Sequence, residues 1–231
     1  MSSDDTTRLN KFLALQLGIS RREADVLIDS GAVTINNEPV ILGARVTASD
    51  EVFVAGKPIA QKAIPYIYLA LHKPVGYVCS RRAQGDSPTI YELVPAEYHS
   101  LKPVGRLDRN SSGILLLTND GDFAYKMTHP KFAKTKVYHV TLDRELEPLH
   151  QQMISDFGIN LEDGRSQLTL ARLKDGINNQ WEVTMSEGRN RQIRRTFGSL
   201  GYDITKLHRV QFGNYALGDM PSGTLQKVTI S

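Results

Sequence analysis

The chain is poor in cysteine and contains no long hydrophobic run. Cys79 is the single cysteine among 231 residues, which excludes intrachain disulfides and metal clusters built on several thiolates. No apolar stretch approaches the ~18 residues that a membrane-spanning helix needs, and the opening MSSDDTTRLN has no basic segment leading into an apolar one. We therefore expect a cytoplasmic protein without a membrane partner.

Common catalytic signatures are also missing. The sequence contains no GxSxG, GxxxxGK[ST], GxGxxG or HExxH pattern, so nothing local supports a serine hydrolase, a nucleotide-binding loop, a dinucleotide site or a zinc protease. The six histidines show no spacing typical of metal ligands. We predict no metal ion and no nucleotide cofactor. Cys79 lies in the apolar stretch GYVCS, which favours a strand position over a catalytic thiol.

Positive charge is modest overall but concentrated near the C-terminal end. The chain has a net charge of +3, whereas residues 186–210 alone contain six basic and two acidic residues. Such a density suits a nucleic-acid surface and equally suits a solvated helix face. A polyanionic partner is therefore one of two interpretations of the charge pattern.

The first sixty residues predict a small unit of two helices followed by short strands. Apolar residues recur at three- and four-residue steps in RLNKFLALQL, a pattern typical of an amphipathic helix that ends at Gly18. Ser20 and Glu23 form a capping box that starts a second helix, and Gly31 follows its end. Alternating valine and isoleucine residues then predict strands with tight turns.

The stretch RLNKFLALQLGISRREADVLIDSGAVTINNEPV resembles the S4 module, a small RNA-binding unit. Residues 1–60 carry six basic and eight acidic residues, so any contact with RNA must come from a local face. The candidates for that face are Lys11, Arg21, Arg22 and Arg45.

A second, larger unit follows a segment without periodicity. GKPIAQKAIP contains two prolines and mixed polarity, which indicates a linker over residues 56–65, between domains at 1–55 and 66–231. Strand patterns at 114–118, 137–142 and 181–185 mix irregularly with helical patches near 122–128, 147–157 and 190–200. This irregular order predicts an α+β domain with a mainly antiparallel, mixed sheet flanked by helices.

The most informative stretch is GRLDRNSSGILLLTNDGD, in which Asp108 stands between two arginines just before an apolar strand. Two interpretations fit this spacing: a turn aspartate that bonds its own backbone, or a reactive carboxylate on a loop held by a rigid strand. A second stretch, EGRNRQIRRTF, places Arg191, Arg194 and Arg195 on one side of a predicted helix. One of these arginines could pair with Asp108 while the others face phosphate groups.

These two stretches and KTKVYHV, in this order behind the S4-like unit, resemble the ribosomal-RNA pseudouridine synthases of the RsuA, RluB, RluE and RluF family. The resemblance implies an isomerase that converts uridine to pseudouridine within RNA. In that reaction the bond from N1 to C1′ breaks, the base rotates, and C5 joins C1′. Nothing is oxidised or hydrolysed overall, which agrees with the prediction of no cofactor.

The resemblance also assigns roles to single residues. It implies that Asp108 is the catalytic residue, that Tyr138 stacks on the target base and that Arg194 pairs with Asp108. Arg106 would help to fill the space of the extruded nucleotide. The further residues that we predict to bind the RNA substrate are Lys73, Arg189, Arg191, Arg195, Lys11, Arg21 and Arg22.

The motif Asn190-Arg191-Gln192 lacks the histidine that many relatives have before the glutamine, and it looks more like the subgroup that acts on the large subunit. We therefore expect a monomer that modifies 23S rRNA, either free or in a pre-ribosomal particle. The alternatives are a 16S rRNA enzyme, a non-catalytic ribosome-assembly factor, and a hydrolase that uses Asp108 with His129 or His139. Glycoside hydrolysis usually needs two carboxylates, and no second acid stands out.

Overall fold

The computed structural model describes residues 6–82 and 85–230, which form two compact units. The first unit ends at Tyr66 and the second begins at Ile67. Each unit has its own cluster of buried hydrophobic side chains. No helix in the described ranges is long and apolar enough to cross a membrane.

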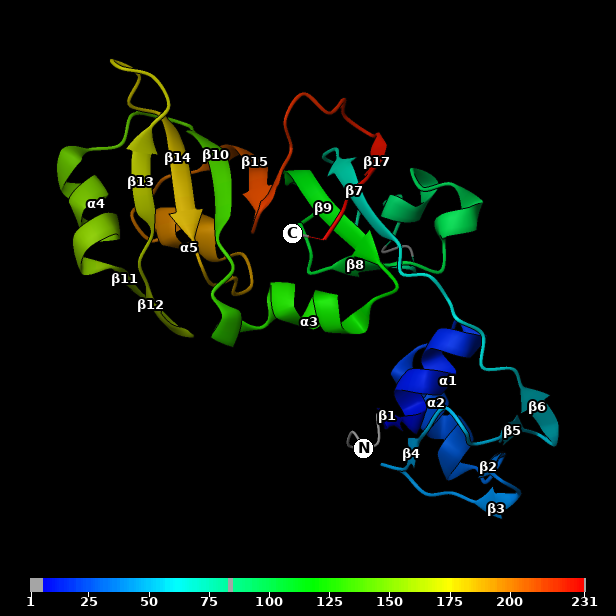
Figure 1. The fold of residues 1–231 in the computed structure, drawn as a ribbon. Helices are drawn as coiled ribbons and strands as arrows, with labels where there is room; N and C mark the ends of the chain where they lie inside the picture. Colours follow the sequence, from blue (N-terminus) through cyan, green and yellow to red (C-terminus); the bar gives the residue numbers. More distant parts are fainter. Residues whose placement is uncertain (1–5, 83–84, 231) are drawn as a thin grey trace. The chain divides into compact units, whose positions relative to one another are not determined.

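The N-terminal unit packs two helices against short strands (Figure 1). Its elements are β1 (Thr7–Arg8), α1 (Leu9–Leu17), α2 (Arg21–Asp29), β2 (Val33–Ile35), β3 (Glu38–Pro39), β4 (Arg45–Val46), β5 (Val52–Val54) and β6 (Lys57–Ile59). Strands β3, β2, β5 and β6 form one antiparallel sheet in that order, and β1 pairs with β4.

Both predicted helices are confirmed, together with the residues that end and begin them. The buried Leu9 and Leu13 of α1 pack in one cluster with the apolar face of α2. Gly18 ends α1 in the left-handed conformation, at φ 69°. Ser20 accepts a hydrogen bond from the Glu23 backbone, and the Glu23 carboxylate accepts one from the Ser20 backbone, which completes the predicted capping box.

The predicted linker is partly wrong, because its first half belongs to the N-terminal sheet. Lys57–Ile59 forms β6, which pairs with β5 so that Pro58 lies opposite Phe53. Strand β6 is at the edge of the sheet, where a proline removes no ladder hydrogen bond from a neighbouring strand. Pro58, one of the two prolines that indicated a linker, is therefore compatible with an edge strand.

The second unit is built on a large mixed sheet. In spatial order its strands are β13 (Thr169–Arg172), β14 (Gln180–Met185), β10 (Lys136–Leu142), β15 (Ile204–Phe212), β9 (Ser112–Thr118), β7 (Tyr68–Lys73) and β17 (Leu225–Lys227), with β8 (Lys102–Val104) beside β9 and β16 (Tyr215–Ala216) beside β15. A separate hairpin contains β11 (Ile159–Leu161) and β12 (Gly164–Ser166).

Helices flank this sheet (Figure 1). They are the α-helices α3 (Gly121–Thr128), α4 (Pro148–Gln152) and α5 (Gln192–Gly198), the π-helix η4 (Met153–Phe157), and the 3₁₀ turns η1 (Ile90–Glu92), η2 (Ala96–Tyr98) and η3 (Pro130–Phe132). The predicted helical patch at 147–157 is thus a short α-helix that continues as a π-helix. The prediction of an α+β domain with a mainly antiparallel, mixed sheet is confirmed.

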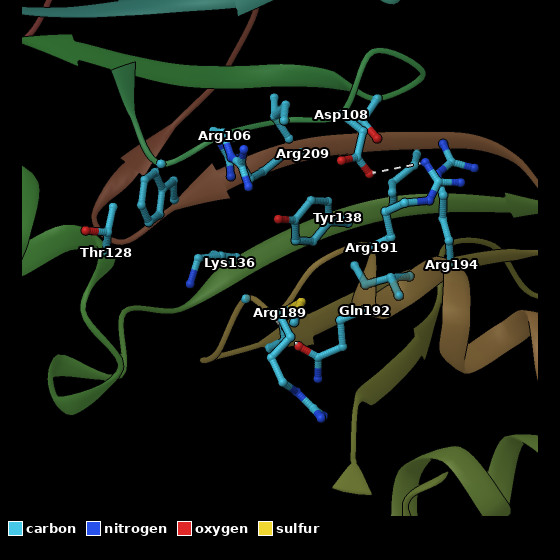
Figure 2. A pocket seen from close by; sticks show the side chains of 18 residues that line it. Arg106, Asp108, Thr128, Lys136, Tyr138, Arg189, Arg191, Gln192, Arg194 and Arg209 are labelled. Carbon is cyan, nitrogen blue, oxygen red and sulfur yellow. Dashed lines mark hydrogen bonds and ion pairs between the residues drawn. The ribbon is translucent and has the colours of Figure 1, made fainter. Parts of the chain in front are cut away.

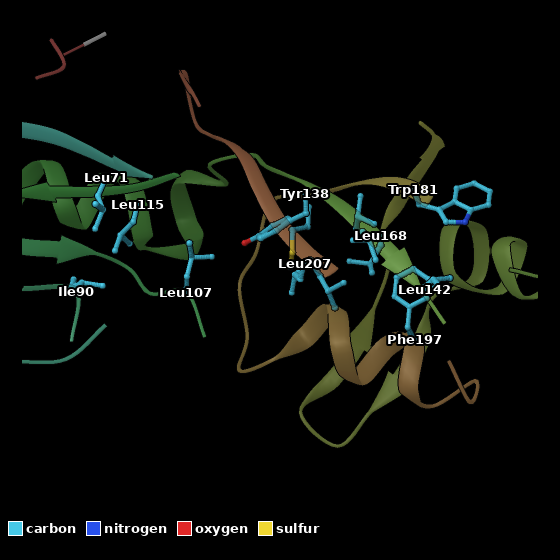
Figure 3. Close-up of a cluster of buried hydrophobic side chains, with 14 of the residues drawn as sticks. Leu71, Ile90, Leu107, Leu115, Tyr138, Leu142, Leu168, Trp181, Phe197 and Leu207 are labelled. Atoms are coloured by element: carbon cyan, nitrogen blue, oxygen red, sulfur yellow. The ribbon is translucent and has the colours of Figure 1, made fainter. Parts of the chain in front are cut away.

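One parallel contact joins the two halves of the sheet. Every other pair of neighbouring strands is antiparallel, whereas β9 and β15 run parallel, with Ser112 opposite His208 and Gly113 opposite Arg209. The larger hydrophobic cluster runs across this contact on one face of the sheet, from Leu71 and Leu115 to Trp181 and Phe197 (Figure 3). The loop that contains Asp108 enters β9 at this contact.

Candidate active site

The Asp108 loop is fixed by a buried lysine. The loop connects β8 to β9, and Lys73 at the end of the neighbouring β7 is fully buried beneath it. The Lys73 ammonium donates to the backbone carbonyls of Pro74 at 2.9 Å, Asp108 at 3.2 Å and Ser111 at 2.8 Å. Three carbonyl oxygens around one cation hold the loop backbone in place.

Our prediction that Lys73 binds the RNA substrate is contradicted by this burial. A side chain without exposed surface has no path to a phosphate group, and its three donor positions are already used inside the protein. Burial lowers the pKa of Lys73 to about 8, an effect that the nearby Asp108 partly opposes. Lys73 therefore acts on the site through the backbone of the loop.

The Asp108 carboxylate faces Arg191. Its side chain is 35% exposed, and its Oδ2 lies 3.7 Å from Nη1 of Arg191. Arg191 precedes α5 in the left-handed conformation, at φ 45° and ψ 33°. It therefore does not continue the helical face of Arg194 and Arg195, as a helix starting at Asn190 would have required.

Arg194 was predicted to pair with Asp108, but the arginine at ion-pair distance from that carboxylate is Arg191. The Arg194 guanidinium donates to the backbone carbonyls of Asn110 at 2.8 Å and Ile204 at 2.9 Å. It thus connects the end of the Asp108 loop with the start of β15. In this structure Arg191 lies at ion-pair distance from the carboxylate and Arg194 holds the loop, while the Asp108 charge also acts on the pKa of Arg194. Pairing of Arg194 with Asp108 in the RNA complex stays a prediction.

Tyr138 lies in the same cavity as Asp108 (Figure 2). The cavity has a volume of about 180 Å³, below the ~300–1,000 Å³ typical of pockets for drug-sized ligands, and suits a single base. Its walls come from the Asp108 loop, the end of α3, β10, the end of β14, the segment that leads into α5 with the start of α5, and β15. The polar side chains among its lining residues are Arg106, Asp108, Ser111, Thr128, Lys136, Tyr138, Arg189, Arg191, Gln192, Arg194 and Arg209.

Arg209 and Lys136 are functional candidates that the sequence reasoning missed. Arg209 on β15 is 2% exposed, donates from Nε to the Ile114 carbonyl at 2.9 Å, and lies 4.8 Å from the Phe212 ring centroid. Its buried Nη2 has no hydrogen-bond partner among the described residues. Lys136 Nζ lies 5.5 Å from the same ring, and burial lowers its pKa. The cavity wall therefore contains more positive charge than the Asp108 motif indicates.

Two arginines that we predicted to bind RNA contact an acid of the protein. Arg189 Nη1 lies 2.8 Å from Asp163 Oδ1, and Arg195 Nη2 lies 2.6 Å from Asp163 Oδ2. Hydrogen bonding from Arg195 holds the pKa of the Asp163 carboxyl below its usual value. Asp163 is in the turn between β11 and β12, so the two arginines attach this hairpin to the start of α5. Their contact with RNA stays a prediction.

Gln192, the last residue of Asn190-Arg191-Gln192, holds the chain at the start of α5. It is buried, donates to the Ser166 hydroxyl at 3.1 Å and to the Glu187 carboxylate, and accepts the Arg189 backbone N–H at 3.1 Å. These bonds fix the chain immediately before Ile193, which lines the cavity. In the sequence, this positioning role was indicated by a glutamine between the charged Arg191 and the apolar Ile193.

The remaining sequence candidates lie outside the cavity. His139, on the strand residue after Tyr138, faces Glu182 at 3.8 Å, and His129 accepts the Lys131 backbone N–H at 3.2 Å. Neither histidine lines the cavity with Asp108, so the hydrolase alternative loses its proposed partners. Cys79 follows an isolated bridge at Val78 and lies in no strand, in contrast to our prediction. Burial raises the pKa of the Cys79 thiol, which disfavours a catalytic thiolate.

In the N-terminal unit, the predicted RNA-binding arginines are on the surface. Arg21 and Arg22 are exposed in the first turn of α2, where the helix dipole adds partial positive charge. Arg45 is also exposed and donates to the Thr6 hydroxyl and carbonyl at 2.6 and 2.7 Å. Lys11 lies on α1 and is half-buried. The start of α2 is therefore a local positive surface on an otherwise acidic unit.

Comparisons with known proteins agree with both sequence resemblances. The S4 domain family matches residues 7–52, and the RNA pseudouridylate synthase family matches residues 67–199. Ribosomal large subunit pseudouridine synthase B of Bacillus subtilis is 34% identical, over 96% of this chain and 92% of its own length. Ribosomal small subunit pseudouridine synthase A of Pasteurella multocida is 36% identical, over 92% of this chain and 91% of its own.

Two further similarities cover nearly the whole chain. The dual-specificity RNA pseudouridine synthase RluF of Salmonella typhi is 35% identical over 99% of this chain and 78% of its own length. A crystal structure of a pseudouridylate synthase superposes with a TM-score of 0.66 at 32% identity, over 96% of both chains. The protein therefore belongs to the RNA pseudouridylate synthase family and has an S4 domain in front of the catalytic unit.

Proposed function

We propose that this pseudouridine synthase isomerises one uridine of 23S rRNA and that Asp108 is the reacting carboxylate. The observation that carries the proposal is the cavity in which Asp108, Tyr138 and Arg191 meet. A uridine within folded RNA is out of reach until it leaves the stack, at a cost of a few kcal/mol. Stacking on Tyr138 would recover ~1–3 kcal/mol of that cost.

Within this cavity Asp108 acts on the ribose of the extruded nucleotide. Its carboxylate either attacks C1′ or removes a proton from C2′, and in both routes the electron pair of the N1–C1′ bond leaves with the base. The base then rotates and C5 bonds to C1′. In the first route this bond displaces the Asp108 carboxylate from C1′, and in the second the protonated Asp108 returns the proton to C2′. C5 then loses a proton and N1 gains one. Arg191 orients the carboxylate, and Arg106 at the rim would occupy the space that the nucleotide leaves.

The target RNA is the part of the proposal that rests on the sequence motif alone. Asn190-Arg191-Gln192 favours 23S rRNA, while the relatives include enzymes named for the large subunit, for the small subunit and for dual specificity. An S4 unit with exposed arginines suits a structured RNA site, which is recognised largely by shape and phosphate contacts. Ribosomal RNA, free or in a pre-ribosomal particle, is therefore the proposed partner of a monomeric, cytoplasmic enzyme.

Mapping of pseudouridine in a strain that lacks this gene tests the target directly. We expect the 23S rRNA of that strain to lose one pseudouridine and the 16S rRNA to lose none, as read by carbodiimide-dependent primer-extension stops. Re-expression of the intact chain should restore the stop. Loss confined to 16S rRNA would contradict the target while keeping the chemistry, and loss in neither molecule would favour a non-catalytic assembly factor.

Substitution of the two arginines should separate their roles. Arg191→Ala removes the contact at 3.7 Å to Asp108, and we expect a turnover about 10- to 100-fold lower with an unchanged melting temperature, because misplacement of a reacting group is costly. Arg194→Ala leaves two carbonyls without their donor, at about 1–3 kcal/mol, and should lower the melting temperature by ~2–4 °C per kcal/mol. Thermal unfolding measures the melting temperature of each variant, and single-turnover experiments measure its rate. If Arg194→Ala lost turnover without losing stability and Arg191→Ala did the opposite, Arg194 would be the partner of Asp108.

A further inference from the structure

Exposed aromatic rings gather on the segment between α3 and β10. Tyr125 on α3 is 46% exposed, and Phe132 on η3 is 36% exposed. The exposed His129 lies between them in the sequence. We call Tyr125, His129, Phe132 and Lys131 the aromatic patch. Exposed apolar side chains that lie together are candidates for an interaction site, whereas singly scattered ones are normal.

The rings of the aromatic patch hold one another in place. The Tyr125 and His129 centroids are 4.7 Å apart, and the Tyr125 and Phe132 rings meet at 88° with centroids 5.7 Å apart. The Lys131 ammonium lies 5.2 Å from the Tyr125 centroid and 4.7 Å from that of Phe132. Lys131 covers one face of each ring, so a planar group can stack on the opposite face or in place of the Lys131 side chain.

The backbone beneath the aromatic patch is also constrained. Pro130 begins η3, and the His129 ring accepts the Lys131 N–H to cap this turn. Ala133 ends it in the left-handed conformation, at φ 43°. The turn that carries Lys131 and Phe132 is therefore held by a proline, a side-chain cap and a left-handed residue.

The aromatic patch adjoins the candidate active site. Thr128, one residue before His129, lines the cavity that contains Asp108, and it is labelled at the edge of that cavity in Figure 2. The Thr128 methyl group lies 3.4 Å from the position of a Cβ built on Gly105, where the GRLD motif begins. The exposed Lys126 and the half-buried Lys134 add positive charge on either side. Thr128 therefore connects the segment of the aromatic patch with the cavity.

We propose that the aromatic patch binds an unpaired nucleotide of the substrate RNA next to the target uridine, by stacking its base on Tyr125 or Phe132. The proposal rests on the proposed function of the neighbouring cavity. Three properties favour RNA over a protein partner: a lysine lies against the rings, Thr128 of the same segment lines the cavity, and stacking accepts any base. The lysines would contact the adjoining phosphates.

Substitution of the exposed rings tests the proposal with little risk to the fold. We expect Tyr125→Ala and Phe132→Ala, in the full chain, to raise the KM for total rRNA from the strain lacking this gene. Loss of one stacked base corresponds to ~1–3 kcal/mol, or about 5- to 150-fold. We expect kcat to change less than about threefold, because the patch does not touch the reacting atoms. Tyr125→Trp should keep the KM of the unmodified chain, whereas Tyr125→Leu should not.

Phe157→Ala is the matched control, because Phe157 is 60% exposed on η4 and lies outside the patch. Its KM should not change. Equal KM values for the patch variants and for this control would overturn the proposal. A KM effect that appears with partly assembled particles but not with free rRNA would also overturn it, in favour of a ribosomal-protein partner.

A second measurement uses the unmodified chain and requires no variant to fold. Total rRNA transcripts that contain 4-thiouridine are irradiated with the full-length protein, and cross-linked peptides are identified by mass spectrometry. Cross-links to the peptide of residues 125–134 support the proposal, and their absence while other peptides of residues 67–231 are cross-linked contradicts it.

Binding of a short oligouridylate with one 2-aminopurine separates the aromatic patch from the reaction. Stacking on Tyr125 or Phe132 should quench the fluorescence, and Tyr125→Ala with Phe132→Ala should abolish the quenching. This assay needs no turnover, so it tests the aromatic patch even if the protein modifies neither rRNA. Absence of modification would refute the proposed function and would not refute the patch. If the unmodified chain quenches the fluorescence no more than the double variant does, base stacking on the patch is refuted and the proposed function is unaffected.

Discussion

Replacement of Asp108 by asparagine is expected to abolish pseudouridine formation, with a loss of at least ~10⁴-fold in single-turnover rate. The amide keeps the shape of the side chain but can neither attack C1′ nor accept a proton from C2′. Binding of rRNA should stay within a few-fold, because the side chain is one of many contacts and the loop backbone is held by Lys73. Quantification of pseudouridine by carbodiimide stops, beside filter binding of the same RNA, measures both quantities.

A surface acid provides the control for this experiment. Asp219 is exposed and does not line the cavity, so Asp219→Asn should retain full turnover. Substantial residual turnover of Asp108→Asn would refute the assignment of the reacting group. A large loss of RNA binding would instead indicate that the carboxylate organises the positive wall of the cavity around Arg191 and Arg209.

The elements that the sequence predicted are those whose signals are local. The capping box at Ser20 and the apolar spacing of α1 are recorded in a few neighbouring residues, and the structure contains both. Strand β6 was missed because its pairing with β5 depends on tertiary contacts, while Pro58 by itself indicates a break. The parallel joint between β9 and β15 links residues about 95 positions apart, so no local pattern could reveal it.

The sequence predicted the site residues that belong to motifs. It did not predict the positions of side chains that depend on burial in the folded chain. Asp108, Tyr138 and Arg106 were named from motifs, and the structure brings them into one cavity. Lys73 was misplaced because a lysine at the end of a strand usually reaches solvent, whereas here it is enclosed by the Asp108 loop. The approach of Arg191 to Asp108 depends on one left-handed residue before α5, a conformation that the sequence pattern does not indicate.

The glycine that follows Ser111 and Ser112 is required by the backbone that packs against it. Gly113 lies at the parallel joint, opposite Arg209, with φ +112°. A Cβ at this position would contact the Arg209 carbonyl oxygen and would lie 2.6 Å from the Arg209 nitrogen. Both neighbours are backbone atoms of β15, so the clash cannot be relieved by a side-chain rotation.

Gly113→Ala is therefore expected to destabilise the catalytic unit by more than ~4 kcal/mol, an exceptional value for the addition of one methyl group. Gly76→Ala is the matched control, because Gly76 has φ +96° with open space around its Cβ position and should cost only the ~1–2 kcal/mol of the backbone conformation. Urea unfolding of both variants measures the difference. Equal destabilisation would show that β9 and β15 separate easily, and that the joint does not fix Asp108 relative to Arg209 and Tyr138.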